Sequence, residues 1–217
     1  NVTSLTSSSL TDLGTLATAI TNNEFSNATG LTTIAVSDTT VDATTLANTI
    51  DSYDSINGGS TTGMTLAAGA TINVDADEVD HMLLDETENR LTIGDQKITV
   101  TNAITVDTAN LLAATTSGVV TATIAGTETV TELATLSADG GTNALTIAIR
   151  SADATAATAD QLNTINAATS VAVDLNNVTG LAASSLSDLT DLATAINAGQ
   201  FSNAAGLTTI AVSDTTI

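Results

Sequence analysis

The chain has 217 residues and carries 24 acidic side chains against 3 basic ones, and this net charge of −21 excludes nucleic acid as a partner, because phosphate binding needs a basic surface. The absence of cysteine excludes disulfides and thiolate metal sites, and the absence of any long apolar run argues against membrane insertion. Hydrophobic residues make up 42% of the chain but only three are aromatic, so we expect a thin core of Leu, Ile, Val and Ala.

A helix is predicted first, over residues 8–20. Its apolar residues fall three or four positions apart and form one stripe along the helix. Ser8 or Ser9 is suited to the N-cap, because a serine hydroxyl can accept a hydrogen bond from a free amide of the first turn.

Strand-like and helix-like runs then alternate along the chain. The strand-like runs mostly alternate an apolar residue with Thr or Ala, as expected of a half-buried strand. They cover residues 31–36, 70–74, 97–100, 103–106, 119–125, 144–149, 170–175 and 207–212. The helix-like runs begin with residues that favour N-caps. They cover residues 42–50, 107–115, 129–136, 158–169 and 184–196.

Residues 75–106 interrupt this alternation. The part from 75 to 90 is far more charged than the rest of the chain, and the part from 91 to 106 has a β pattern with a candidate turn at Gly94-Asp95-Gln96. We therefore expect an irregular coil or a hairpin in this insertion.

The order of strand, acidic cap, short helix and loop recurs about every 20 to 37 residues, a spacing typical of solenoids. Short crossovers of this kind give parallel strands and right-handed coils. We therefore predict an α/β fold: an elongated solenoid of strand–short-helix coils, about six to eight in number, with a parallel sheet on one side and helices on the other.

The two ends of the chain carry nearly the same sequence. Residues 1–41 align without gaps with residues 177–217, and 29 of the 41 positions are identical. We interpret residues 1–176 as one long repeat cassette and residues 177–217 as the start of the next, so that the chain is a segment of a much longer repetitive polypeptide. The expected partners are neighbouring repeats of the same polypeptide, or other copies of it, arranged end to end.

The phrasing of these repeats resembles that of a known class of proteins. The stretches LLAATTSGVVTATIAGT (111–127) and TADQLNTINAATSVAVDLNNVTGL (158–181) are similar to the tandem-repeat regions of giant secreted bacterial cell-surface proteins, including those of marine cyanobacteria, which are often exported by type I secretion. The resemblance implies an extracellular or cell-surface location and a structural, adhesive or motility-related role. The glycine-rich nonapeptide of calcium-binding RTX repeats, which such proteins can carry, is absent.

Calcium is the one cofactor that the sequence suggests. Closely spaced carboxylates in a loop are the ligands that calcium prefers, and the candidate set is Asp75, Asp77, Glu78 and Asp80. An EF-hand is excluded, because Asp80 occupies the position that needs glycine. The alternative interpretation is a solvated acidic loop without a metal.

Further aspartates recur after strands or before helices, at Asp38, Asp42, Asp107, Asp153, Asp160 and Asp214. They are compatible with a row of ion sites, but helix capping and turn formation already explain their positions. His81 is the only histidine, so neither a zinc site nor a catalytic triad is predicted.

We expect no enzyme, since no residue set supports one. The hypothesis that follows is a structural repeat segment, either a spacer or a filament-forming part of a long extracellular protein. One alternative is a calcium-dependent adhesin module that binds glycan or another cell. A further alternative is an ice-binding solenoid, suggested by the Thr-rich patterns at 98–101 and 119–123, although β-propensity alone explains threonine there.

Overall fold

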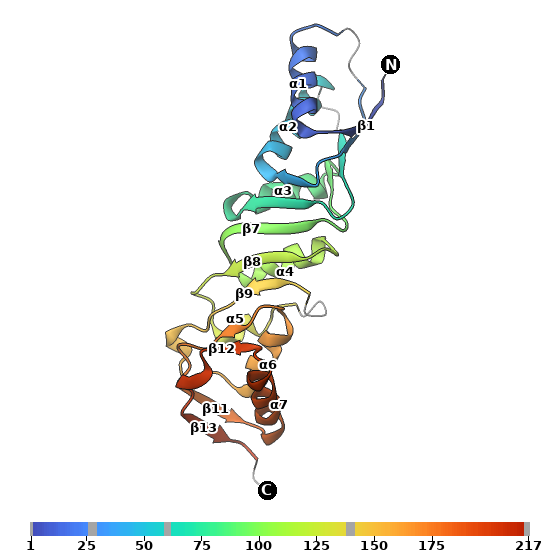
Figure 1. Cartoon of the computed structure of the whole chain (residues 1–217). Coiled ribbons are helices and arrows are strands. Elements are labelled where there is room, and N and C mark those ends of the chain that lie inside the picture. The colour runs from blue at the N-terminus through green and yellow to red at the C-terminus, as the bar shows by residue number, and fades with distance from the viewer. Residues whose placement is uncertain (1, 26–29, 59–61, 138–141, 215–217) are drawn as a thin grey trace. The chain divides into compact units, whose positions relative to one another are not determined.

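The computed structural model describes residues 2–25, 30–58, 62–137 and 142–214 (Figure 1). The chain divides into two compact units. Unit 1 comprises residues 1–101 and 115–118, and unit 2 comprises residues 102–114 and 119–217. The described residues form seven α-helices and a set of short strands that pair in parallel. The prediction of a mixed α/β fold with parallel sheets is therefore confirmed.

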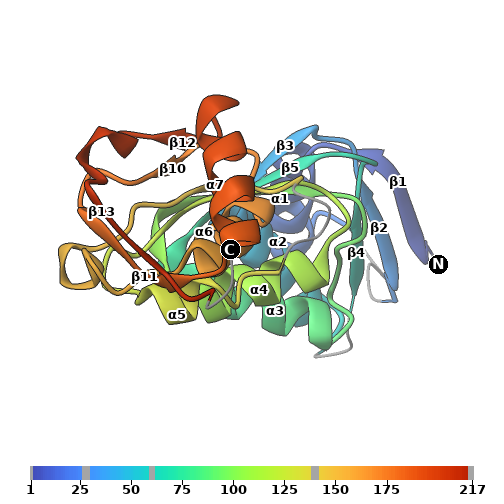
Figure 2. The same ribbon diagram turned by 90° about the horizontal axis from the view of Figure 1, so that it is seen from below.

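Unit 1 contains two parallel sheets. Its elements in chain order are β1 (Ser4–Ser8), α1 (Leu10–Thr21), β2 (Thr33–Val36), β3 (Thr40–Asp42), α2 (Ala43–Ile56), β4 (Gly63–Leu66), β5 (Thr71–Asp75), α3 (Val79–Thr87), β6 (Leu91–Thr92) and the first part of β7 (Lys97–Ile104). The strands are ordered β1-β2-β4-β6 in one sheet, while β3, β5 and β7 are neighbours in the other. Figure 2 shows β1, β2 and β4 along one wall of the unit and β3 and β5 along another.

Unit 2 follows the same alternation with shorter strands. Its elements are α4 (Val106–Thr115), β8 (Val120–Ile124), α5 (Val130–Leu133), β9 (Ala144–Thr146), α6 (Ala159–Ala167), β10 (Val173–Asp174), β11 (Gly180–Ser184), α7 (Leu186–Asn197), β12 (Phe201–Ser202) and β13 (Thr209–Val212). Within the unit, β8 pairs with β9, β10 with β12, and β11 with β13.

Strand partners lie at similar distances along the chain. Thr121 pairs with Ala144 and Thr40 with Thr71, which are 23 and 31 residues apart, and the pairs Thr33–Gly63 and Met64–Leu91 lie between these values. One helix, or in unit 2 one helix with its flanking turns, lies in each step. These connections are the short helical crossovers that parallel strands require.

The core consists of aliphatic side chains that meet in register. Ile72 lies beside Ile98 and Val74 beside Val100 across the β5–β7 pair, and all four are buried. Successive side chains of a strand point to opposite faces, which explains why the residues between them are half-buried or exposed. The expectation of a thin core without large aromatics matches this arrangement, with Tyr53 and Phe201 as the buried aromatic residues among those described.

The expectation for residues 75–106 was wrong. Residues 79–87 form helix α3 instead of an irregular coil, because Val79, Met82 and Asp85 fall on one buried stripe and the other charges face solvent. Residues 91–106 do not form a hairpin, since β6 pairs in parallel with β4 and β7 pairs in parallel with β5. Gly94 and Asp95 lie where the chain passes from β6 in one sheet to β7 in the other.

The prediction of one sheet on one side was also too simple, because unit 1 has two. The sequence signal was missed at β3 and β4, which have three and four residues. A period of two cannot be recognised over so few positions.

Buried polar side chains satisfy the backbone at the corners between helices and strands. The Thr169 hydroxyl accepts from Leu145 N (2.9 Å) and donates to Leu145 O (2.7 Å). Asn143 Oδ1 accepts from Val120 N (2.9 Å), and the Thr62 hydroxyl donates to Leu31 O (3.0 Å). Each bond reaches a residue 23 to 31 positions earlier in the chain, in a strand or just before one, so buried peptide groups that the short strands leave unpaired find partners.

Replacement by alanine should have opposite effects at two glycines, Gly118 and Gly14. A Cβ atom at Gly118 would lie 2.3 Å from the carbonyl oxygen of Gln96, whereas a Cβ atom at Gly14 in α1 would have nothing within 4 Å. We expect Gly118→Ala to destabilise unit 1 by about 2 kcal/mol, because the backbone of Asp95 and Gln96 would have to move away from the added methyl group. We expect Gly14→Ala to stabilise it by about 0.5–1 kcal/mol through helix propensity. Urea unfolding followed by circular dichroism measures both, and a neutral Gly118→Ala would contradict the close packing of this corner.

Candidate functional site

Two of the four residues predicted to bind calcium, Asp75 and Glu78, already accept hydrogen bonds within the fold. Asp75 ends β5, where its carboxylate accepts from Asp77 N (3.2 Å) and from the Thr101 hydroxyl (3.0 Å). Glu78 accepts from the Thr44 hydroxyl at the start of α2 (2.6 Å), while Asp77 and Asp80 are exposed. In the part of the chain that the structure describes, no three carboxylate or histidine side chains form a group that could hold a metal ion. The calcium site therefore stays a prediction that the geometry does not support.

Four of the six recurrent aspartates act as helix caps, whereas Asp107 and Asp160 lie inside the first turns of α4 and α6. Asp42 caps its own helix, where it accepts from Thr45 N (2.9 Å). Asp38, Asp153 and Asp214 instead cap a helix that lies earlier in the chain: they accept from the first helical amide of α1, α5 and α7, at 2.7, 2.8 and 2.6 Å. Ser184 does the same for the first amide of α6 at 2.9 Å.

These caps link successive parts of the fold. The acceptor lies 23 to 28 residues after the amide that it bonds, which is close to the spacing of the strand pairs. Each cap satisfies an amide that has no partner inside its helix, and it does so only when the following segment is in place. Four helices are thus coupled to later chain by a directed hydrogen bond as well as by apolar packing.

Asp153 is the most strongly held of these caps. It is buried, and it accepts from Val130 N and from Arg150 Nε (2.9 Å). Burial on its own raises the pKa of Asp153, but the hydrogen bonds from Arg150 and Val130 outweigh burial and lower this pKa below its ordinary value. The ionised form is therefore the one that stabilises the fold.

A second charged cluster joins α2 to α3 around Arg90. The guanidinium pairs with Asp54 (2.9 Å) and Asp51 of α2, with Asp85 of α3 (3.1 Å) and with Glu88 (3.7 Å). Four carboxylates thus share one cation. Sequence reasoning missed this cluster, although a lone arginine within an acidic segment is a signal that could have located it.

Asp85 lies at the bottom of this cluster. It is 1% exposed. Burial raises the pKa of Asp85, and the nearby Arg90 charge offsets this only in part. The ionised Asp85 is therefore tolerated because of Arg90 rather than being a source of stability on its own.

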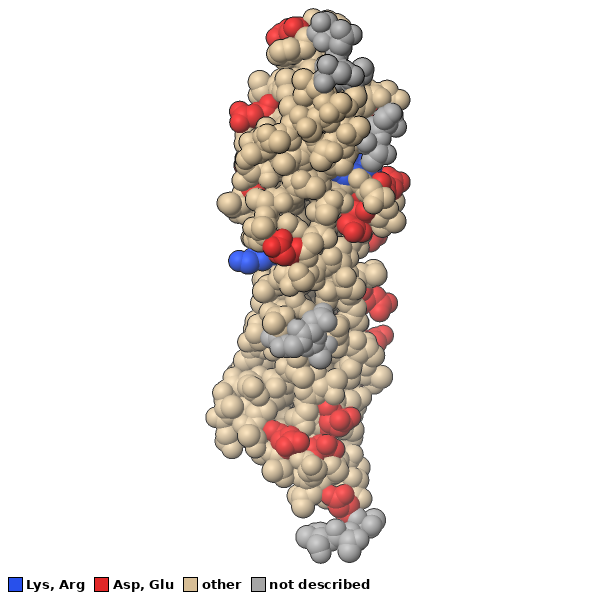
Figure 3. Space-filling model, turned by 90° about the vertical axis from the view of Figure 1, so that its right-hand side faces the viewer, with Lys and Arg blue, Asp and Glu red and all other residues tan. Residues whose placement is uncertain are grey.

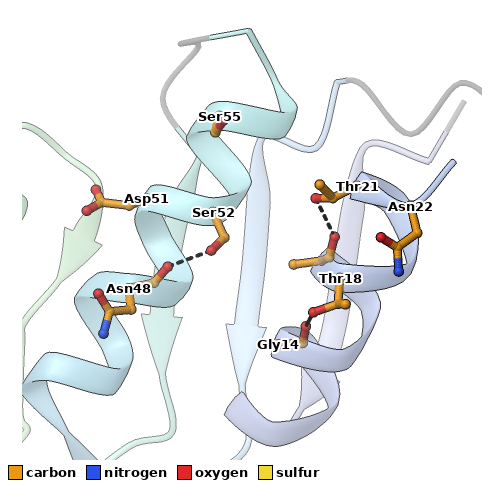
Figure 4. Close-up of a pocket in the computed structure, with 9 residues that line it drawn as sticks. Gly14, Thr18, Thr21, Asn22, Asn48, Asp51, Ser52 and Ser55 are labelled. Atoms are coloured by element: carbon orange, nitrogen blue, oxygen red, sulfur yellow. Dashed lines mark hydrogen bonds between the residues drawn. The ribbon is translucent and has the colours of Figure 1, made fainter.

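A hollow in unit 1 lies between α1 and α2 (Figure 4). It has a volume of about 560 Å³ and is lined mainly by hydroxyl and amide side chains. The hydroxyls of Thr18, Thr21 and Ser52 donate to carbonyls of their own helices, at 2.9, 2.9 and 2.8 Å. These three hydroxyl donors are therefore already used within the helices.

His81 lies exposed on α3, with no nucleophile paired to it among the described residues. The acidic side chains stand at several separate places on the face shown in Figure 3. None of the helices described is long and apolar enough to cross a bilayer.

No family model, curated protein or solved structure matches the chain. The candidate functional feature is therefore the set of contacts through which each segment packs on the next.

We predict that Arg90→Ala destabilises unit 1 by about 3 kcal/mol at pH 7, because it leaves buried Asp85 ionised without its partner. A buried carboxyl with a raised pKa stabilises the fold when protonated and loses that stability as pH rises through its folded pKa. The difference in the free energy of unfolding between Arg90→Ala and the native chain should therefore narrow as pH falls toward about 4.

Urea unfolding at several pH values tests this prediction. Lys97→Ala is the matched control, since it removes the same charge from an exposed position. A loss for Lys97→Ala that equals the loss for Arg90→Ala would show that net charge, rather than the buried pair, is responsible.

Asp153→Asn should destabilise unit 2 by about 1–2 kcal/mol at pH 7, because the amide cannot pair with Arg150. A carboxyl with a lowered pKa contributes stability above its unfolded pKa and loses it as pH falls through the folded pKa. The effect should thus be complete above about pH 5 and vanish in stronger acid. Thermal unfolding measures it, with exposed Asp107→Asn in the first turn of α4 as control. An effect that persists unchanged in acid would contradict the assignment.

Proposed function

We propose that the chain is a structural repeat segment of a long extracellular or cell-surface protein, folded as a solenoid in which each coil covers the next. The observation that carries this proposal is the constant direction and similar length of the steps between strand partners. In the β3–β5 and β8–β9 pairs, for example, the parallel partner lies 31 and 23 residues further along the chain. This is the spacing that repeated coils require.

The contacts between coils support a mechanical role. Strand hydrogen bonds, aliphatic ladders and the caps from Asp38, Asp153 and Asp214 all join a coil to the following one. A coil added to such a stack repeats contacts that already exist, so length can increase without a new design. The near-identity of residues 1–41 and 177–217 is the sequence trace of such lengthening.

The composition agrees with an exterior location. The chain has no cysteine to be oxidised and a net charge of −21, which keeps a long protein soluble. The two Thr patterns that suggested ice binding pair threonine with threonine only in part: Thr123 pairs with Thr146, but Thr99 pairs with Asn73 and Thr101 with Asp75.

Small-angle X-ray scattering tests the proposal on a lengthened chain, made by appending residues 42–217 after Ile217. A solenoid should gain maximum dimension in proportion to the added coils at a constant cross-section. A globule of the same mass should instead grow with only about the 0.38 power of residue number, and this outcome would contradict the proposal.

Thermal unfolding with calcium and with EGTA separates the plain spacer from a calcium-dependent adhesin module. A spacer should unfold at the same temperature in both solutions. A drop of many degrees on chelation would favour the adhesin and would show that the acidic residues bind the ion.

A further inference from the structure

The duplicated segment adopts the same local structure in its two copies. In the first copy β1 pairs with β2 through Leu5 and Ile34, and in the second β11 pairs with β13 through Leu181 and Ile210, with the same irregularity three residues later. The helix N-caps are also equivalent: Ser9 and Ser185 each accept from the third helical amide at 3.1 Å. The cross-coil caps Asp38 and Asp214 correspond as well.

The environment of this segment differs sharply between the copies. Ile34 is 0% exposed and Val36 is 3% exposed, whereas their equivalents Ile210 and Val212 are 52% and 50% exposed. Leu10 is 8% exposed and its equivalent Leu186 is 52% exposed. We call this surface of the second copy the leading face, defined by Leu186, Leu189, Leu207, Ile210 and Val212. Leu186, Ile210 and Val212 are each about half exposed, and large apolar side chains exposed in this way mark an interaction site.

The first copy shows what covers the equivalent surface. Strand β4 pairs with β2 over four residues, from Thr33–Gly63 to Val36–Leu66. Helix α2 packs on α1, and the hydroxyl of buried Tyr53 donates to Leu13 O (3.0 Å).

Polar contacts complete this cover. The Asn57 amide donates to Leu31 O (2.6 Å), and the Thr62 hydroxyl donates to the same oxygen (3.0 Å). The cover is therefore one continuous stretch, residues 42–66, that supplies a helix, a strand and the polar groups for the corner.

We propose that the leading face receives a strand-and-helix segment equivalent to residues 42–66, supplied by the next stretch of the same repetitive polypeptide. This inference rests on the proposed function and names the partner of one surface. The face needs no rearrangement, because its strand register and both helix caps are already formed. Docking then costs little ordering of the receiving side.

The opposite side of the duplicated segment also differs between the two copies, but there the second copy is the one that is covered. Phe25 is 54% exposed in the first copy, whereas its equivalent Phe201 is 6% exposed, beside Val173 of β10. Leu16 is half-buried, and its equivalent Leu192 is 2% exposed. One side of the segment is therefore covered by chain that precedes it and the other by chain that follows it. This favours an equivalent of residues 42–66 as the occupant over a second leading face.

Hydrogen exchange tests the proposal on the full chain extended with residues 42–101 after Ile217, which supply the remainder of unit 1 up to Thr101. Mass spectrometry of peptides that cover residues 207–214 reports on β13. We expect exchange there to slow by at least about tenfold relative to the unextended chain, because β13 changes from an edge strand that pairs with β11 to a strand that is paired on both sides.

Two variants of the extended chain provide the control. Ile210→Asp places a charge on the leading face and should return exchange of β13 to the unextended rate. Ser187→Asp adds the same charge at a position that is exposed in both copies, as its equivalent Thr11 shows, and should preserve the protection. Unchanged exchange of β13 in the extended chain overturns the proposal, whether the added residues fold elsewhere or remain unprotected.

The hydrogen-exchange result for β13 tests the assigned partner separately from the scattering experiment, which tests the spacer. A lengthened chain that grows linearly while β13 stays unprotected would retain the spacer and refute the assigned partner. Protection of β13 in a chain that does not grow linearly would retain the partner and refute the spacer.

Discussion

Parallel backbone pairing between each strand and the strand that follows one crossover is the interaction on which the structure depends. The strands are two to eight residues long, so no strand pair on its own buries much area. Stability accumulates because the aliphatic side chains of one strand meet those of the next in register, as Ile72 meets Ile98. A chain with three aromatic residues has few other means of building a core.

Short strands impose a second constraint, which polar side chains resolve. Every corner between a helix and a strand contains peptide groups that no ladder satisfies, and an unsatisfied buried group costs about 1–3 kcal/mol. Thr169 and Asn143 satisfy such groups at the corners, and Asp38 and Asp153 satisfy the first amides of helices. The high content of Thr, Asn and Asp is therefore a structural requirement of the fold. Asp38, Asp42, Asp153 and Asp214, which were compatible with a row of ion sites, have this capping role.

The sequence predicted the elements that are long enough to show a period. The helix over residues 8–20 corresponds to α1 with Ser9 as its cap, and the strand-like run at 119–125 corresponds to β8. Prediction from the sequence failed at β3 and α3. In β3 three residues carry no usable pattern, and in α3 a dense surface of charge concealed a buried stripe of Val79, Met82 and Asp85. The lone Arg90 in an acidic segment was a usable signal, but its carboxylate partners could not be assigned from the sequence, because they come from α2 and α3, which only the fold brings together.

Tyr53 gives unit 1 a spectroscopic signal that unit 2 does not have. It is the only tyrosine, and the chain has no tryptophan, so phenol emission originates where α2 meets α1. Burial raises the pKa of Tyr53 to about 12, which keeps the ring neutral and emissive in mildly alkaline buffer. Far-ultraviolet dichroism, in contrast, sums the helices of both units. Denaturation curves from the two signals coincide only if both units melt together, so the placement of one ring makes their cooperativity measurable without a label.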